Sequence, residues 1–296
     1  MNKVEAALLS FLSKAAQGEA EMPRHILEDF GKSAQKALEK QFTNENKDFY
    51  LRMSNVGRPL CQLQMQAKNV KPETPTYDFK MRMILGDVIE ALVISLLEAA
   101  GVNVKNKHKK VELKIDKKNS ITGEFDIELD DGIYDIKTVS PYAFEYKFKS
   151  DNAFERIKES DSFGYVSQGL GYGMANKVPF RGWLAVNKST GEIAVAEAVD
   201  NKEERENVYD NIRKVVKAIS SDKPFQRSFT DNEEVYYGKP TGNRTLGIEC
   251  SYCPYKYDCW GNIEFRRQLP SKGKNPKWVY YTYISEEWQD RLNDNS

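Results

Sequence analysis

The N-terminal part of the chain shows the apolar spacing of amphipathic α-helices. In residues 4–16 and 24–42, apolar side chains recur three and four positions apart, and Pro23 separates the two stretches. This spacing places the apolar side chains on one face of a helix. We therefore expect two helices within residues 1–44, followed by an irregular segment, residues 50–75, where glycines and prolines exclude one long helix.

The middle of the chain changes from a helical period to a strand period. Residues 78–100 hold the longest apolar helical pattern and predict a helix. Residues 121–129 and 132–139 have strand character and are joined by the turn sequence DDG, which predicts a hairpin. Residues 111–115 are a candidate for a further strand.

Helices and strands continue to alternate in the C-terminal half. Residues 163–176 predict a glycine-containing helix, 180–199 a hairpin that turns at the sequence STG, and 203–219 another helix. Residues 238–275 are rich in Gly, Pro and Cys and have little periodicity. Such a composition is expected where bound ligands, rather than a hydrophobic face, fix the path of the chain.

Composition indicates a compact protein and restricts any attraction for nucleic acid to local patches. Hydrophobic residues make up 40% of the 296 positions, enough for a substantial core. Lys plus Arg and Asp plus Glu number 44 each, so overall charge does not favour DNA. Basic segments that could contact DNA, or be ordinary solvated surface, are residues 105–110 and the set Arg266, Lys272, Lys274 and Lys277.

No part of the chain is typical of a membrane span or a signal peptide. The apolar run ALVISLLEAAGV, which follows Glu90, is shorter than the roughly eighteen residues of a membrane helix. Charged residues interrupt the apolar N-terminal stretch, unlike the core of a signal peptide. We therefore expect a cytoplasmic protein without a membrane partner, located in the host cytoplasm if a phage encodes it.

Candidate chemistry rests on carboxylates and lysine, because the only histidines, His25 and His108, lie in no ligand or triad pattern. Along the predicted strand GIYDIKT, the side chains of Asp135 and Lys137 project to the same face. A two-residue turn at Asp131-Gly132 would place Asp126 opposite Lys137 and Glu128 opposite Asp135. On its own, a D-x-K tripeptide is more typical of a surface salt bridge.

A third acid comes from the predicted helix 78–100. Glu90 interrupts its apolar run and shares a face with Gly86, whose missing side chain would let the helix approach a strand or a bound phosphate. Clustered carboxylates repel one another, and a divalent cation such as Mg²⁺ or Mn²⁺ is the simplest compensation. With Lys137 positioning a water or stabilising developing charge, this set predicts phosphodiester hydrolysis.

These motifs resemble those of the PD-(D/E)XK nuclease superfamily. GDVIE with Glu90, GEFD with Asp126, and DIK with Asp135 and Lys137 follow one another in the order and spacing of its motifs. The resemblance implies an α/β fold whose restriction-endonuclease-like core is a central mixed β-sheet flanked by helices. It also implies these ligands for Mg²⁺ or Mn²⁺: Glu90, Asp126, Asp135 and the main-chain carbonyl of Ile136.

A further motif resembles the RecB-like members of that superfamily. The sequence SQGLGY places Gln168 and Tyr172 one helical turn apart, as in their Q-x-x-x-Y motif. The resemblance implies that both side chains contact DNA near the scissile phosphate, whereas a partly buried polar helix face is the ordinary alternative. Many RecB-like nucleases carry a histidine where this chain has Glu90.

The four cysteines predict a metal centre, since an intracellular chain seldom uses disulfides. Cys250, Cys253 and Cys259 form C-x2-C-x5-C, and Cys61 is the only other cysteine. A structural zinc or unligated buried cysteines are the alternatives. One N-terminal cysteine with this C-terminal triplet, bracketing the nuclease motifs, resembles the RecB-like iron-sulfur nucleases of the AddB and Cas-four types. That resemblance covers roughly residues 50–265 and implies a structural 4Fe-4S cluster.

The sequence thus predicts three regions and one leading function. The regions are a helical part at 1–75, a nuclease core at 76–235, and a cluster segment with a tail at 236–296. We expect a DNA exonuclease acting on duplex ends or single strands, in recombination, repair, or phage or CRISPR DNA processing. A structure-specific endonuclease and a non-catalytic DNA-binding adaptor remain alternatives, as do a homo-oligomer and an unidentified processing partner.

Overall fold

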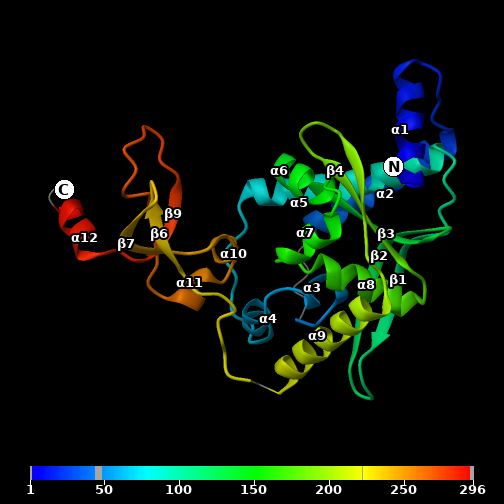
Figure 1. Ribbon diagram of the computed structural model, residues 1–296. Coiled ribbons are helices and arrows are strands. Elements are labelled where there is room, and N and C mark those ends of the chain that lie inside the picture. The colour runs from blue at the N-terminus through cyan, green and yellow to red at the C-terminus, as the bar shows by residue number, and fades with distance from the viewer. Residues whose placement is uncertain (1, 44–48, 222, 294–296) are drawn as a thin grey trace. The chain divides into compact units, whose positions relative to one another are not determined.

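The computed structural model describes residues 2–43, 49–221 and 223–293. The remaining positions of the predicted regions, residues 1, 44–48, 222 and 294–296, lie outside the described residues. Two compact units are present: Met1–Arg58 with Pro75–Ser221, and Pro59–Thr74 with Asp222–Ser296. The division differs from the predicted boundaries at residues 75 and 235. Segment Pro59–Thr74 belongs to the second unit, and the chain returns to the first unit from Pro75 to Ser221. Both units combine helices with a sheet, so the protein is α/β (Figure 1).

The first unit contains most of the helices. Pro23 separates its first two helices as predicted, and the segment after Tyr50 begins with a short helix rather than a wholly irregular loop. No helix of the described ranges is long and apolar enough to cross a membrane. The helices of this unit are α1 (Lys3–Ala16), α2 (Arg24–Phe42), α3 (Met53–Val56), α5 (Tyr77–Ala99), α6 (Pro141–Ala143), the π-helix η1 (Phe144–Phe148), α7 (Ala153–Glu159), α8 (Tyr165–Asn176) and α9 (Lys202–Ser220).

A mixed five-stranded sheet forms the centre of the first unit. Its order is β1-β2-β3-β4-β5, and only the β3–β4 pair is parallel. A parallel pair needs a crossover, which here runs through α6, η1, α7 and α8. The strands are β1 (Asn106–Lys114), β2 (Ser120–Leu129), β3 (Gly132–Val139), β4 (Phe180–Asn187) and β5 (Ile193–Glu197).

Helices cover both faces of this sheet. On β3, Ile133 and Val139 belong to one apolar cluster, together with residues of α3, α7, α8 and α9. Tyr134 and Ile136, on the opposite face of the same strand, belong to a second cluster with residues of α1 and α5. The alternation along β3 therefore assigns Asp135 and Lys137 to the face that α8 covers.

The β2–β3 turn differs from the sequence prediction. Leu129 pairs with Gly132, so the two-residue turn is Asp130-Asp131, and Glu128 lies opposite Ile133 instead of Asp135. Gly132 serves a different purpose, because a Cβ there would lie 2.3 Å from the carbonyl oxygen of Pro179. The predicted pairing is therefore wrong by two residues, an even shift that keeps the faces of the side chains.

The second unit also contains strands where the sequence suggested ligand-bound loops. Two of its four strands lie within residues 238–275, so that expectation was wrong for β7 and β8. The sheet order is β6-β7-β9-β8, and every neighbouring pair is antiparallel. The elements are α4 (Leu60–Ala67), β6 (Asn232–Tyr236), β7 (Lys239–Thr245), α10 (Ile248–Ser251), α11 (Lys256–Trp260), β8 (Glu264–Arg267), β9 (Trp278–Tyr283) and α12 (Glu286–Asn293).

A buried carboxylate organises the interior of the second sheet. Glu234 is 5% exposed, and its two oxygens accept four hydrogen bonds from neutral side chains. A buried acid is tolerated when donors replace the water that it has lost. The four donors are the side chains of Thr241, Asn243, Gln268 and Tyr281.

The packing of α8 against β4 predicts opposite outcomes for two glycines on one helix. A Cβ at Gly169 would lie 2.3 Å from the ring of Phe180, which is buried against Trp183, whereas a Cβ at Gly171 would make ordinary contacts with the Met53 side chain, the nearest to its sulfur at 3.4 Å. Gly169→Ala should lower stability by about 1–3 kcal/mol through overpacking. Gly171→Ala should be neutral or stabilising, since alanine favours helices. Urea denaturation measures both, and equal effects would contradict this packing.

Candidate active site

The candidate site begins where β2 and β3 separate. The two strands pair over only three residue pairs, Ile127–Tyr134 being the last before they part. Beyond that point the main-chain N–H of Ile136 donates to Oδ2 of Asp126 at 2.6 Å, in place of a ladder bond. The carboxylate of Asp126 is thereby held against β3, next to Asp135.

Asp135 is the most deeply buried acid among the described residues of the first unit. It is 1% exposed, and Nζ of Lys137 lies 2.5 Å from its Oδ2. Neither of its oxygens accepts a hydrogen bond of normal geometry from any described residue. A buried carboxylate with an ion pair but no hydrogen bonds is costly, and proteins retain such groups mainly where they serve a function.

The helix α5 brings Glu90 within electrostatic reach of these groups. Burial raises the pKa of Glu90 to about 7; nearby Lys40 opposes this rise, and Asp135 adds to it. Burial also raises the pKa of Asp126 well above its ordinary value, and the charges of Asp135 and Glu90 add to the rise. The three predicted carboxylates and Lys137 thus lie within electrostatic reach of one another. Glu128, in contrast, accepts hydrogen bonds from Asn106 and Asn176 and lies outside this group.

Lys137 remains protonated in this setting. Burial alone would lower its pKa, but Asp135 and Asp126 outweigh burial and raise the pKa overall. Its ammonium also lies 5.0 Å from the ring centroid of Tyr165, a cation–π distance. A lysine held in this way can donate hydrogen bonds and stabilise negative charge, but it cannot act as a base at neutral pH.

The predicted pair on α8 reaches the same region. Nε2 of Gln168 donates to the hydroxyl of Tyr172 at 3.0 Å, as their spacing of one turn allows. Burial raises the pKa of Tyr172, and the charge of Asp135 adds to the rise. Gly123 on β2 makes room for this ring, because a Cβ there would lie 2.7 Å from it. Tyr172 therefore stays a neutral phenol beside the carboxylates.

Three polar residues that the motifs did not indicate surround Glu90. His108, on β1, places Nδ1 3.5 Å from Oε1 of Glu90 and 4.0 Å from Oε1 of Glu124, and burial lowers its pKa. Lys40 on α2 forms an ion pair with Asp87 at 2.9 Å. Nothing in the sequence around His108 predicts that it lies near Glu90. The packing of α2 against α5, which places Lys40 near Asp87, could not be predicted from the sequence either.

A pair of stacked aromatic rings borders the lysine. Tyr165, which contacts Lys137, stacks on Phe163 with centroids 5.5 Å apart and an interplanar angle of 16°. Phe163 is 60% exposed, so one face of the stack is open to solvent. Phe163 precedes α8, and Tyr165 is its first residue. The two aromatic residues on either side of Gly164 are the sequence feature that could have indicated this pair.

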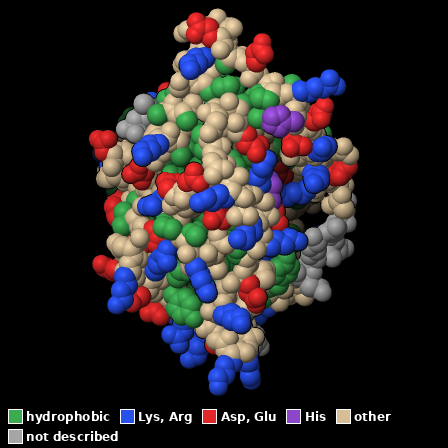
Figure 2. Space-filling model, turned by 90° about the vertical axis from the view of Figure 1, so that its right-hand side faces the viewer, with side chains coloured by type: hydrophobic (Ala, Val, Ile, Leu, Met, Phe, Trp, Pro, Cys, Tyr) green, Lys and Arg blue, Asp and Glu red, His purple; other side chains and the backbone are tan. Residues whose placement is uncertain are grey.

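The largely polar surface around β1 is electrically mixed. In the predicted basic segment 105–110, Lys107 pairs with Glu98 at 2.6 Å, and Lys105 pairs with Asp130 at 3.3 Å. Figure 2 shows Lys and Arg side chains interspersed with Asp and Glu side chains over the face that it views. Two of the four lysines of this segment thus have acidic partners, and its contact with DNA stays a prediction.

The four cysteines belong to the second unit. Burial raises the pKa of Cys250 to about 11 and also raises the pKa of Cys253 and Cys259, and the charge of Cys61 adds to each rise. The thiols are therefore near enough to affect one another. In the described parts of the chain, however, no three His, Cys, Asp or Glu side chains are already arranged to hold a metal ion. This applies equally to the carboxylates.

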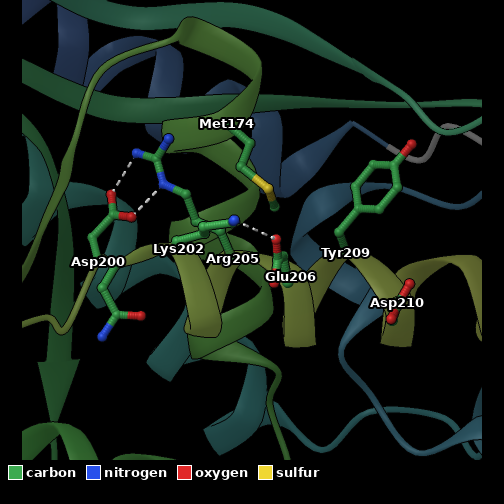
Figure 3. A pocket seen from close by; sticks show the side chains of 8 residues that line it. Met174, Asp200, Lys202, Arg205, Glu206, Tyr209 and Asp210 are labelled. Carbon is green, nitrogen blue, oxygen red and sulfur yellow. Dashed lines mark hydrogen bonds and ion pairs between the residues drawn. The ribbon is translucent and has the colours of Figure 1, made fainter.

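A pocket of about 650 Å³ lies along α9 and contains none of the predicted site residues (Figure 3). Its most prominent polar group is Arg205, whose guanidinium donates to both carboxylate oxygens of Asp200. The same guanidinium donates to the carbonyl of Val178 at 3.2 Å. Asp200 in turn accepts the N–H of Phe180 at 2.7 Å. These contacts fix the start of β4 and give the pocket a structural role.

The raised pKa of Glu90 predicts a pH-dependent stability. Its pKa is about 7 in the folded chain and about 4.5 when unfolded, so between these values the folded state binds more protons. In EDTA, stability should therefore fall as pH rises from 4.5 to 7. Glu90→Gln should flatten this fall, changing the melting temperature at pH 7 by a few °C. Identical pH profiles for wild type and Glu90→Gln would contradict the burial of this carboxyl.

Comparison with known proteins adds little to this site. No protein-family model and no curated protein matches the chain. Among solved structures, the chain is similar to one titled "Crystal structure of SSO0001", with 14% sequence identity and a TM-score of 0.43, over 77% of this chain and 95% of that chain. A similarity at this level carries no functional argument, so the case for function depends on the side chains themselves.

Proposed function

We propose that this protein is a divalent-metal-dependent deoxyribonuclease that hydrolyses phosphodiester bonds. The observation that carries the proposal is the buried carboxylate of Asp135, whose one polar contact among the described residues is the ammonium of Lys137 and which lies within electrostatic reach of Asp126 and Glu90. Its further support is the resemblance of these motifs, in order and spacing, to the RecB-like branch of the PD-(D/E)XK nucleases.

The chemistry of these donors suits Mg²⁺ or Mn²⁺, and a bound cation would have to draw the carboxylates closer together than they lie in the described chain. Both cations prefer carboxylate and carbonyl oxygens, and the cluster offers three carboxylates with the main-chain carbonyl of Ile136 between two of the motif residues. Burial raises the pKa of Glu90 and Asp126, and the negative charge of Asp135 adds to both rises. A divalent cation would offset that negative charge and lower both pKa values.

When bound, such a cation would polarise the scissile phosphate and lower the pKa of a water molecule. Asp126 and Asp135 would hold it, and Glu90 would complete the set from α5. Lys137, which stays protonated, would orient the attacking water and stabilise the negative charge that develops on phosphate oxygens.

The side chains of α8 would position the DNA strand. The hydroxyl of Tyr172 accepts a hydrogen bond from Gln168 and keeps its own proton, and because Tyr172 is buried, the half-buried Gln168 is the member of the pair that would reach a phosphate oxygen. The open face of Phe163, stacked on Tyr165 beside Lys137, can receive an unpaired base next to the scissile bond. An unpaired base is available in single strands and at frayed ends, which favours the exonuclease over the endonuclease alternative.

A non-catalytic adaptor is the less favoured function. A DNA-binding adaptor would gain nothing from a buried acid that has no hydrogen bonds of normal geometry. Asp135, buried near Asp126 and Glu90, lowers the stability of the fold when no metal is bound. Glu234 in the second unit shows how this chain satisfies a buried carboxylate that has only a structural role. Processing of DNA in recombination, repair, or phage or CRISPR systems is the pathway class that we propose for the enzyme.

Asp135→Ala should abolish cleavage of end-labelled single-stranded and duplex DNA in Mn²⁺, by a factor of 10³ or more, while the variant stays folded. Wild-type protein should gain thermal stability with Mn²⁺ at pH 8, and Asp135→Ala should not. Glu128→Gln is the matched control, since it changes a carboxylate on β2 that faces Asn106 and Asn176. The proposal fails if Asp135→Ala turns over DNA at a near-normal rate.

We further propose that the second unit holds a 4Fe-4S cluster with a structural role. Three thiols of C-x2-C-x5-C and Cys61 are a sufficient ligand set, and their mutual effect on pKa is what a shared site requires. Segment Pro59–Thr74 is already tied to this unit, because Gln64 donates to the carbonyls of Lys223 and Pro224 at 3.2 and 3.3 Å. A cluster would therefore stabilise contacts that the chain makes by itself.

Anaerobically purified protein should be brown and contain about four irons per chain. Cys61→Ala should lose most of the iron, lower the melting temperature and expose residues 222–293 to proteolysis, because 189 positions separate Cys61 from Cys250 and the closed loop is long. Ser251→Ala, between two of the cysteines, should keep both iron and stability. Colourless protein with one zinc per chain would overturn the iron-sulfur assignment in favour of structural zinc.

A further inference from the structure

One face of the second sheet displays aromatic side chains to solvent. Phe265 on the edge strand β8 pairs with Tyr280 on β9, and Arg267 pairs with Trp278. Paired residues of antiparallel strands project to the same side, so these four side chains share one face. Phe265 is 49% exposed and Trp278 is 54% exposed, and the chain itself leaves them uncovered in the described structure.

The rings of this face form a continuous stack. The ring centroid of Phe265 lies 4.4 Å from that of Tyr280, with an interplanar angle of 26°. It lies 5.1 Å from the ring centroid of Trp278, with an interplanar angle of 33°. Tyr257 of α11 extends the row with an edge contact to Tyr280 at 6.2 Å. The guanidinium of Arg267 lies 5.8 Å from the Trp278 ring. The rings are therefore held in fixed orientations instead of moving freely as isolated surface side chains.

Folding of the sheet does not explain this face. The opposite side carries Tyr281, which is buried and donates to Glu234, so the interior of the sheet is complete without the aromatic stack. Large exposed aromatic side chains in contact with one another are unfavourable in water and typically mark a binding surface. We call the set Phe265, Trp278, Tyr280 and Arg267 the β8–β9 face.

The chain segment that carries the β8–β9 face is rich in positive charge. Residues 264–278 contain five basic side chains and one acidic side chain, Glu264, which pairs with Arg266 at 3.0 Å. The loop between the two strands contributes Lys272, Lys274 and Lys277, all exposed and without an ion pair within the described ranges. Aromatic rings bordered by cations match the two parts of a single nucleotide strand, its bases and its phosphates.

We propose that the β8–β9 face binds single-stranded DNA by stacking unpaired bases on Trp278 and Phe265, with Arg267 and the loop lysines contacting phosphates. The choice of DNA rests on the proposed nuclease function, whereas the stacking rests on the geometry of the face alone. Bases within a duplex already stack on their neighbours, so duplex DNA offers this face only its backbone. A hydrophobic peptide would fit the rings but not the surrounding lysines.

Fluorescence anisotropy of a fluorescein-labelled oligo(dT), titrated with the full-length protein, tests this proposal. The buffer contains EDTA, because a metal-dependent enzyme cannot cleave the DNA without its metal. Phe265→Ala/Trp278→Ala should weaken binding at least tenfold, as expected for the loss of two stacking contacts. Trp278→Phe, which keeps a ring, should retain most of the affinity. Affinity for a blunt duplex of the same length should change less than twofold in either variant.

Tyr283→Ala is the matched control, because Tyr283 is 51% exposed on the same strand but projects from the opposite face. The proposal is wrong if the double variant binds oligo(dT) like wild type, if Tyr283→Ala weakens binding equally, or if oligo(rU) binds at least tenfold more tightly than oligo(dT). Should the double variant not fold, the single Trp278→Ala decides. If binding of oligo(dT) depends on the rings but the protein does not cleave DNA in Mn²⁺, the proposed nuclease function is wrong and the proposed binding site is supported.

Discussion

The first unit depends on the separation of β2 from β3 beside a buried acid. Because the ladder ends after three pairs, the N–H of Ile136 is free to bond to the carboxylate of Asp126. That bond holds two acids near each other despite their repulsion. Lys137 neutralises one of them, and burial, to which the remaining negative charge adds, raises the pKa of Asp126 and Glu90. The electrostatics of the site therefore follow from a feature of strand pairing.

The two units treat a buried carboxylate in opposite ways. Glu234 accepts four hydrogen bonds from neutral donors, which replace its lost water and leave nothing for a ligand to supply. Asp135 has one ammonium beside it and no hydrogen bond of normal geometry among the described residues. The contrast distinguishes an acid that holds a sheet together from an acid poised for a cation, within one chain and under the same solvent conditions.

Much of the candidate site could be predicted because it depends on local periodicity. The two-residue period of β3 places Asp135 and Lys137 on one face, and the observed ion pair agrees with it. The helical period of α8 brings Gln168 within hydrogen-bond distance of Tyr172. Even the wrong turn assignment, at Asp131-Gly132 instead of Asp130-Asp131, preserved the faces, since the register shifted by two residues.

The sequence by itself determined the long helices α1, α2, α5, α8 and α9 and the two strands of the first hairpin, since each depends on neighbours a few positions away. Tertiary structure alone decided which distant residues meet. It placed His108 beside Glu90, used Gly132 for a close approach to Pro179 rather than for the turn, and joined segment Pro59–Thr74 to the C-terminal unit. Such contacts depend on how whole elements pack, and the period of a single segment carries no information about its partner.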